Sequence, residues 1–326
     1  MLYVYSHKSD RLVLRGEAGE AAAASAIWFD LVNPTAEEDS FVEARMGLSI
    51  PTREEMEEIE LSSRLYSEDG AEYLTVTALT AVDSGDPSKT PITFILKGKR
   101  LVTVRYAEPT AFTLYSARVR KPNAISCATG ERIMLGLLEA MVARLADILE
   151  RTSNETDAIS REIFRRKASV KRKTRNLEVV IEQLGRKGDL LAMARESLIG
   201  VNRLVGYHQA IEASLTKEDK EGRQRAKMLY RDVASLSDHA QFLTSTIGFL
   251  LDATLGLINL QQNQIIKIFS VAAVIFLPPT LVASIYGMNF RSMPELEWLF
   301  GYPWALLLMV ISALLPYFYF KRRGWL

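Results

Sequence analysis

The chain has 326 residues, of which 48% are hydrophobic, and its 40 basic and 39 acidic residues give a formal net charge of +1. This length allows two domains, and the balanced charge gives no global electrostatic reason to predict a nucleic-acid partner. The single cysteine, Cys127, excludes an intrachain disulfide and a multi-cysteine metal site, and it fits a reducing compartment.

Residues 1–125 are predicted to form a cytosolic α/β or α+β domain, because strand-like and helix-like segments are mixed in them. Two helices are expected, at Thr35–Met46 and Thr52–Glu60. The sequence from Lys97 to Arg100, KGKR, predicts a hairpin turn between two strands. The runs rich in β-branched and aromatic residues that predict strands are Leu2–Tyr5, Ala26–Leu31, Tyr73–Val82, Ile92–Leu96 and Leu101–Tyr106.

Long helices are predicted next, because no proline occurs between Pro122 and Pro278 and Leu, Ala, Glu, Lys and Arg are abundant there. Residues 126–221 are expected to be a helical hairpin region, with breaks at Gly185–Asp189 and Thr216–Gly222. Residues 222–285 are then predicted to be one long stalk helix that continues into the membrane. No linker separates its soluble part from its apolar part.

Two runs of 23 residues, Ile268–Phe290 and Trp298–Phe320, carry no charge. As helices, each would rise about 35 Å at 1.5 Å per residue, enough to cross a hydrocarbon core of about 30 Å. They predict two transmembrane helices, joined by an extracytoplasmic loop at 286–301. The second helix is placed at 302–320 and is followed by a basic cytosolic tail at 321–326. A buried core hairpin is the alternative.

The charges beside these runs predict their orientation. Lys267 precedes the first run, whereas the connection holds Arg291 against Glu295 and Glu297. The second run is followed by Lys321, Arg322 and Arg323. Because basic residues concentrate on the cytoplasmic side of membrane proteins, both termini are expected in the cytoplasm of a multi-pass inner-membrane protein.

The sequence carries no phosphate-binding loop or nucleophile elbow, so an enzyme is not predicted. Its histidines, His7, His208 and His239, are scattered and do not show a carboxylate–histidine spacing typical of zinc. No aromatic platform or recognised binding motif is interleaved with the basic run from Arg161 to Arg175, so the run is interpreted as a solvated helix face rather than a nucleic-acid site.

Two helices cannot enclose an aqueous path, so transport would require an oligomer. A period near 3.5 residues collects polar and apolar side chains on one line of the first membrane helix, here called the stripe, which heptad spacing would keep facing a shared axis. The stripe residues are Asp252, Asn259, Asn263, Ile266, Phe269, Ala273, Leu277 and Thr280. Polar side chains that only bond a neighbouring helix are the alternative, but Pro278-Pro279 is expected to bend or open the helix and favours a cavity.

The segment SIYGMNFRSMPEL, Ser284 to Leu296, lies between the two uncharged runs. Gly287 would let the chain turn and bring a carbonyl close to an axis, and Asn289 adds an amide oxygen. A ring of neutral oxygens suits a hydrated divalent cation, because it binds the water shell without removing it. Glu295 and Glu297 would then raise the cation concentration at the outer mouth.

These residues carry a family resemblance. The sequences YGMNF at Tyr286–Phe290, MPEL at Met293–Leu296, GYP at Gly301–Pro303 and YFKRRGWL at Tyr319–Leu326 closely resemble the CorA magnesium/cobalt transport proteins. Ile258–Ser284 is also similar, most of all to the enterobacterial-type branch. WFDLVNPTAEE at Trp28–Glu38 resembles the family more weakly.

The resemblance implies a funnel-shaped homopentamer in a bacterial inner membrane that transports Mg²⁺, and also Co²⁺ or Ni²⁺. Gly287, Met288 and Asn289 match its selectivity motif, and Asn289 is the strongest candidate metal-contacting residue. The stripe matches pore-lining positions, with Ile266, Phe269 and Leu277 as an apolar gate and Asp252 at the cytoplasmic end. Lys321, Arg322 and Arg323 match a basic ring. Asp232 matches an acid that senses cytosolic Mg²⁺.

The function expected from the sequence is therefore passive, voltage-driven uptake of hydrated Mg²⁺ that closes when internal Mg²⁺ is plentiful. Membrane lipid and divalent cations are its expected partners. Two alternatives remain. One keeps the architecture but transports zinc or another divalent cation, although Met288 argues against the zinc-transporting relatives. The other is a membrane-anchored cytosolic receptor or enzyme without transport.

Overall fold

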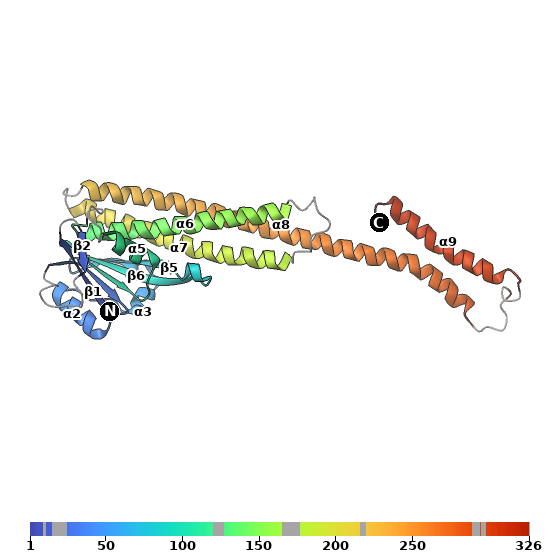
Figure 1. The fold of residues 1–326 in the computed structure, drawn as a ribbon, viewed down its shortest axis with the longest axis horizontal. Helices are drawn as coiled ribbons and strands as arrows, with labels where there is room; N and C mark the ends of the chain where they lie inside the picture. Colours follow the sequence, from blue (N-terminus) through green and yellow to red (C-terminus); the bar gives the residue numbers. More distant parts are fainter. Residues whose placement is uncertain are drawn as a thin grey trace. The chain divides into compact units, whose positions relative to one another are not determined.

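The computed structural model of the chain describes residues 1–8, 11–14, 25–119, 127–164, 177–215, 220–288, 294 and 298–325. The chain divides into two compact units, Met1–Leu250 and Leu251–Leu326 (Figure 1). The first unit holds a β-sheet and long helices. The second is formed by the end of one long helix and a final helix. One helix, α8 (Lys220–Tyr286), contributes to both units.

The sheet of the first unit is mixed. Its described strands are ordered β2-β1-β3-β7-β6-β5-β4. The β3–β7 pair is parallel and the other described pairs are antiparallel. The strands are β1 (Leu2–Lys8), β2 (Arg11–Leu14), β3 (Ala26–Val32), β4 (Leu65–Glu68), β5 (Ala71–Thr80), β6 (Ser88–Lys97) and β7 (Arg100–Arg105). The mixed α/β fold class predicted from the sequence is confirmed, whereas β2 and β4 were not predicted.

The KGKR hairpin forms as predicted between β6 and β7. Lys97 pairs with Arg100, so the turn itself contains two residues. Gly98 has a φ of +61°, a left-handed conformation that glycine adopts without steric cost. The hairpin therefore places β7 beside β6 and leaves the other edge of β7 to pair with β3.

Local capping explains where two short helices of the first unit begin. Helix α2 (Ala36–Met46) begins after Thr35, whose hydroxyl accepts from the Glu38 amide while the Glu38 carboxylate accepts from the Thr35 amide. This reciprocal cap satisfies two amides that a helix start leaves free. Thr52 and Glu55 repeat the arrangement at α3 (Arg53–Glu57). The predicted helix Thr52–Glu60 is wrong at its end, because Glu58 has an extended ψ of 142° and a separate turn, α4 (Leu61–Arg64), follows.

The sheet is buried on both faces, as strands that pair in parallel usually are. On one face the strand side chains pack with α2 and α3; this cluster includes Phe29, Leu31, Ile95, Val102, Val104, Val42, Met46 and Met56. Trp28, one residue before Phe29, points to the opposite face, where its ring lies 6.3 Å from that of Tyr115 in α5 (Thr110–Val119). Helices α6 (Gly130–Phe164) and α7 (Leu177–Leu215) contact the sheet as well.

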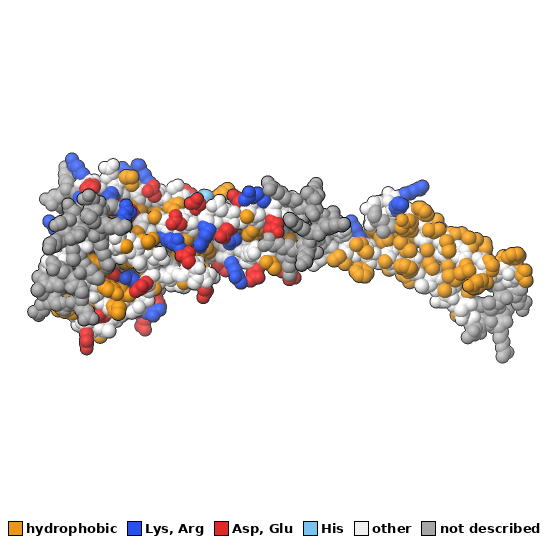
Figure 2. Space-filling view, viewed as in Figure 1, with side chains coloured by type: hydrophobic (Ala, Val, Ile, Leu, Met, Phe, Trp, Pro, Cys, Tyr) orange, Lys and Arg blue, Asp and Glu red, His pale blue; other side chains and the backbone are white. Residues whose placement is uncertain are grey.

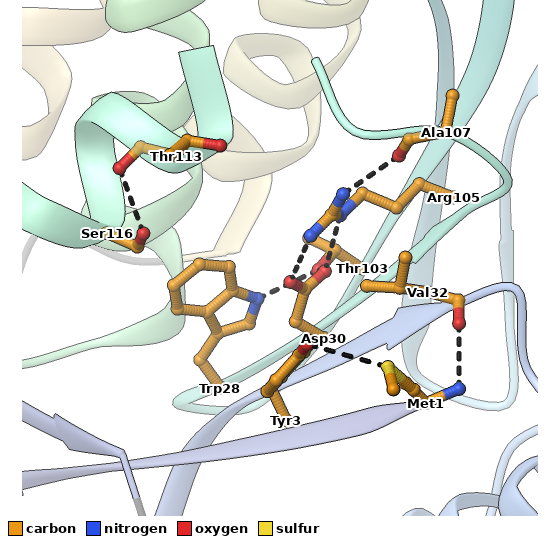
Figure 3. Close-up of polar contacts among 10 residues, drawn as sticks. All are labelled: Met1, Tyr3, Trp28, Asp30, Val32, Thr103, Arg105, Ala107, Thr113 and Ser116. Carbon is orange, nitrogen blue, oxygen red and sulfur yellow. Dashed lines mark hydrogen bonds and ion pairs between the residues drawn. The ribbon is translucent and has the colours of Figure 1, made fainter. Parts of the chain in front are cut away.

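A buried ion pair joins β3 and β7 on the face that carries Trp28 (Figure 3). Arg105 donates from Nε to Asp30 Oδ1 at 3.0 Å and from Nη2 to Asp30 Oδ2 at 2.9 Å. The Thr103 hydroxyl donates to Asp30 Oδ1 at 2.7 Å and accepts from the Trp28 indole at 2.9 Å. Arg105 also donates to the Ala107 carbonyl at 2.8 Å. The carboxylate and the guanidinium are therefore paired and hydrogen-bonded, which a buried ion pair requires.

The predicted helix break at Gly185–Asp189 is wrong. Helix α7 continues through this segment from Leu177 to Leu215. Leu184 and Leu191, which flank the two glycines, are both fully buried. Two glycines in a helix cost about 1 kcal/mol each, and the burial of the adjacent leucines offsets that cost because each contributes about 1.5–3 kcal/mol.

We expect substitution of glycine by alanine to have opposite effects on the free energy of unfolding at Gly130 and at Gly185. A Cβ at Gly130 would lie 2.5 Å from the Arg100 carbonyl carbon of β7, whereas a Cβ at Gly185 would meet no atom within 4 Å. We expect Gly130→Ala to lower the free energy of unfolding by about 1–3 kcal/mol through overpacking. Gly185→Ala should raise it by about 0.5–1 kcal/mol, because the unfolded chain loses freedom. Denaturant unfolding of the full chain in detergent measures both, and equal stability of the two variants would contradict the close α6–β7 packing.

The second unit consists of the last part of α8 and of α9 (Gly301–Arg322). Prolines lie inside both helices, at Pro278 and Pro279 in α8 and at Pro316 in α9. The predicted stalk helix, Gly222–Ser284, falls within α8, and the predicted helix 302–320 falls within α9.

Candidate ion pathway

The two helices of the second unit have the length and composition of membrane spans. Lys267 Nζ lies 5.6 Å from the centre of the Trp325 ring, so the chain end that follows α9 returns to the level of Lys267. From Lys267 to Tyr286, α8 rises about 28 Å at 1.5 Å per residue, close to the hydrocarbon thickness of about 30 Å. The two helices thus form an antiparallel hairpin of the right height.

On the face that Figure 2 shows, hydrophobic side chains predominate over this hairpin, and blue basic side chains gather at one end of its described part. Lys321, Arg322 and Arg323 lie at the end of α9, the same end at which Lys267 meets Trp325. A basic cluster at one end of a hairpin that carries no charge along its spans is the charge asymmetry of a membrane protein.

The stripe residues are uncovered in the single chain. All eight of them, from Asp252 to Thr280, are exposed. Ile266, Phe269 and Leu277, which the resemblance predicts to be an apolar gate, retain 60%, 72% and 64% of their accessible surface. Phe276, which lies off the stripe, is 68% exposed, so exposure alone does not separate a lipid-facing residue from a pathway-facing one. The stripe is distinguished by its chemistry, since it combines an acid, two amides and a hydroxyl with apolar residues.

The prolines of α8 leave backbone oxygens near the stripe. Because Pro278 and Pro279 lack an N–H, the carbonyls of Val274 and Ile275 lose their usual helical donors. The sequence predicts that the prolines bend or open the helix; helical structure continues through them to Tyr286, so the helix does not end there. Thr280 Oγ1 donates to the Leu277 carbonyl at 2.8 Å, which leaves its oxygen as an acceptor. This part of the helix therefore offers neutral oxygen acceptors.

Gly287 follows the last residue of α8, and the backbone of the preceding turn lies close to it. Its amide donates to the Ala283 carbonyl at 2.9 Å, and the Met288 amide donates to Ile285 at 3.2 Å. A Cβ on Gly287 would lie only 3.1 Å from the Ala283 oxygen. Gly287 is not among the glycines with a left-handed φ, so the cost of a side chain here would come from this tight contact and not from the backbone conformation. Asn289, Glu295 and Glu297 lie outside the described residues.

The two acids expected at the cytoplasmic side are both on α8 and both exposed. Asp232 belongs to the first unit and Asp252 to the second. Asp232 and Asp252 are far apart along the helix, because the 20 residues between them correspond to a rise of about 30 Å. Their proposed roles, in regulation and in the pathway, are therefore separate.

One cluster was missed by reasoning from the sequence. His208, taken there as an isolated histidine, is 3% exposed and lies between carboxylates of β5 and α6. Burial by itself lowers its pKa, but the contacts with Glu131 and Glu72 outweigh burial and raise the pKa to about 9. The available signal was the spacing of four residues between His208 and Glu212, which places both on one face of a helix.

Comparisons with known proteins agree on the identity of the chain. The family model described as "CorA-like Mg2+ transporter protein" matches residues 23–322. The magnesium transport protein CorA of Pasteurella multocida is 35% identical over 326 residues, covering 100% of both chains. The magnesium transport protein CorA of Escherichia coli K12 is 34% identical over 336 residues, again covering 100% of both.

The fold also has a match among solved structures. The complete structure of the CorA magnesium transporter from Methanocaldococcus jannaschii gives a TM-score of 0.77 at 20% identity and covers 100% of this chain and 99% of that one. At this identity the similarity establishes the fold. Family membership confirms that the chain is a transporter and not an enzyme. The matched span and the full-length identity together show that this chain belongs to the CorA family of magnesium transport proteins.

Proposed function

We propose that this chain forms a homopentamer in the bacterial inner membrane and that the pentamer conducts hydrated Mg²⁺ passively into the cytoplasm. The stripe of α8 lines the axial pathway, and Gly287, Met288 and Asn289 form the selectivity motif at its outer end. The basic tail and both termini are on the cytoplasmic side. Co²⁺ and Ni²⁺ are further substrates of the same pathway.

The uncovered stripe is the observation that carries this proposal. Eight side chains with a spacing near 3.5 residues lie on one helix, and all eight are exposed among the residues that the structure describes. Two helices leave no aqueous lumen between them. A line that carries an acid and two amides up to the membrane span, and continues through the span to Thr280, therefore needs other copies of the chain to surround it. A heptad spacing keeps that line directed at a common axis along the helix.

Neutral oxygens along the pathway support a hydrated magnesium ion as the substrate. Mg²⁺ gives up its water reluctantly, so a conducting site favours acceptors that bind its water shell. The Asn289 amide, the Thr280 oxygen and carbonyls freed by proline are acceptors of this kind. Binding through water is weak enough for release, which conduction requires. The apolar residues Ile266, Phe269 and Leu277 close the pathway by excluding water when the helices approach.

The membrane potential supplies the driving force. A divalent cation that crosses an inside-negative potential of 100 mV gains about 4.6 kcal/mol, twice the value for a single charge. That energy supports an accumulation of about 2,000-fold, so nucleotide hydrolysis is not required. Closure at high cytosolic Mg²⁺ would involve Asp232, whose side chain is exposed on α8 and could bind a cation between subunits of the proposed pentamer.

Purified protein in lipid vesicles tests the proposal. With a K⁺ diffusion potential that makes the interior negative, we expect Mg²⁺ influx, reported by an internal magnesium dye. Dissipating the potential should lower the influx toward the rate set by the concentration gradient alone. Hexammine cobalt, which mimics hydrated magnesium and does not exchange its ligands, should block it.

The same vesicles distinguish the two alternatives. Zinc uptake that is driven by a proton gradient alone would favour a zinc transporter of the same architecture. Absence of flux for Mg²⁺, Co²⁺, Ni²⁺ and Zn²⁺ would favour a membrane-anchored receptor.

A further inference from the structure

Three side chains of the first unit that can ligate a metal meet at one place: Glu131 of α6, and His208 and Glu212 of α7. Each offers one ligand atom, and these atoms lie within 4.8 Å of one another. The cluster is remote in the sequence from the stripe and from Asn289. It is more than an acidic patch, because it contains an imidazole that is 3% exposed.

Glu72 of β5 orients the imidazole. His208 Nδ1 lies 2.8 Å from Glu72 Oε2, a hydrogen bond between residues 136 positions apart. The carboxylate accepts from Nδ1–H, so in the neutral ring the lone pair is on Nε2. A carboxylate that fixes the far nitrogen of a metal-binding histidine is a recurrent feature of metal sites, because it sets the tautomer and raises the basicity of the ligand.

The other ring nitrogen faces the remaining carboxylates without a hydrogen-bond partner. His208 Nε2 is 3.7 Å from Glu131 Oε1, within ion-pair distance but too far for a hydrogen bond, and both atoms are buried without a hydrogen-bond partner among the described residues. A buried polar atom without a hydrogen-bond partner is unfavourable, because it has given up its hydrogen bonds to water without replacing them. Two such atoms that face each other across a short gap are what a cation between them would satisfy.

Glu212 completes the cluster, and its carboxylate also forms an ion pair with Arg223, which would compete with a metal for it. Its Oε1 accepts from Arg223 Nε of α8 at 3.0 Å. A carboxylate has two oxygens, so this ion pair leaves an oxygen of Glu212 for a metal. A metal bound at His208 Nε2 would lie between the imidazole and the carboxylates of Glu131 and Glu212.

We propose that Glu131, His208 and Glu212 form a binding site for a divalent transition-metal cation of the Zn²⁺, Co²⁺ or Ni²⁺ class. A site of one imidazole and two carboxylates suits these ions, whereas Mg²⁺ prefers oxygen ligands alone. Ligand atoms of a tetrahedral zinc site lie about 3.3 Å apart, so the observed separations require only small side-chain rotations. A water molecule would fill the fourth position.

The site would fasten α6 to α7 next to β5. It is distinct from the proposed transport pathway in residues and in ligand chemistry, and it does not depend on whether the protein conducts ions. Its ligands come from two helices that close one face of the sheet, so occupancy should stabilise the first unit.

A Co²⁺ titration of the full-length protein in detergent tests the proposal, because the visible absorption of Co²⁺ intensifies in a site of low coordination number. We expect one Co²⁺ per chain with the intense spectrum, undisturbed by a millimolar excess of Mg²⁺. His208→Gln should abolish this spectrum. Glu72→Gln, which removes only the orienting partner, should weaken binding by about 10–100-fold.

His239→Gln is the matched control, because His239 is exposed on α8, and it should bind Co²⁺ like the unmodified chain. Glu212→Gln, at a residue only partly buried, provides a second test if His208→Gln does not fold. The proposal is overturned if His208→Gln or Glu212→Gln retains the intense spectrum at unchanged affinity, if Mg²⁺ displaces Co²⁺ at equal concentration, or if the unmodified chain binds no Co²⁺ with this spectrum.

Discussion

Asn289→Ala is expected to reduce Mg²⁺ influx into vesicles by at least about 50-fold while the oligomer stays assembled. In the proposed pentamer this change removes a ring of five amide oxygens at the outer end of the pathway. Each hydrogen bond to the water shell of the ion contributes about 0.5–1.5 kcal/mol, so the ring contributes at least about 2.5 kcal/mol. A tenfold change corresponds to about 1.4 kcal/mol. The initial rate of Mg²⁺ influx, reported by an internal magnesium dye under a fixed membrane potential, measures this effect.

The control for that experiment is Asn154→Ala, which removes an exposed asparagine from the middle of α6 in the first unit. It should conduct like the unmodified protein. Light scattering after size-exclusion chromatography establishes whether each variant keeps the same mass. Flux through Asn289→Ala at the unmodified rate would refute the assigned role of Asn289, and loss of the oligomer would show that the residue holds subunits together instead.

Arg105→Met is expected to lower the free energy of unfolding by about 3–5 kcal/mol, because it leaves a buried carboxylate without its partner. The side chains of Arg105 and Asp30 are only 7% and 3% exposed. The variant also removes the stacking of the guanidinium on Phe112, whose ring centre lies 4.8 Å from Arg105 Cζ. Denaturant unfolding of the full chain in detergent measures the loss.

The double variant Asp30→Leu with Arg105→Met separates pairing from packing. Replacing both members of a buried pair with apolar residues is often close to neutral, so the double variant should recover most of the lost stability. Arg186→Met is the matched control: the Arg186–Glu182 pair is 76% and 60% exposed, and its loss should cost under about 0.5 kcal/mol. An Arg105→Met variant as stable as the control would show that the buried pair contributes little.

Features that depend on neighbouring residues in the chain were predictable from the sequence. The uncharged runs after Lys267 indicated both membrane helices, because the hydrocarbon thickness sets a length that few other segments reach. The KGKR turn and the strands on each side of it followed from local conformational preference. The stripe follows from positions along one helix, and the Gly-Met-Asn motif is a local sequence pattern just beyond the end of that helix. Their roles stay predictions until flux is measured.

Features that depend on contacts between distant segments were decided only by the tertiary structure. Gly185–Asp189 reads as a break, yet the buried Leu184 and Leu191 hold α7 together through it. Asp30 meets Arg105 across 75 residues because β3 pairs in parallel with β7, and His208 meets Glu72 across 136. Local propensity is a free energy of about 1 kcal/mol or less per residue, whereas burial of a large side chain contributes about 1.5–3 kcal/mol. Packing therefore overrides the local signal wherever the two disagree.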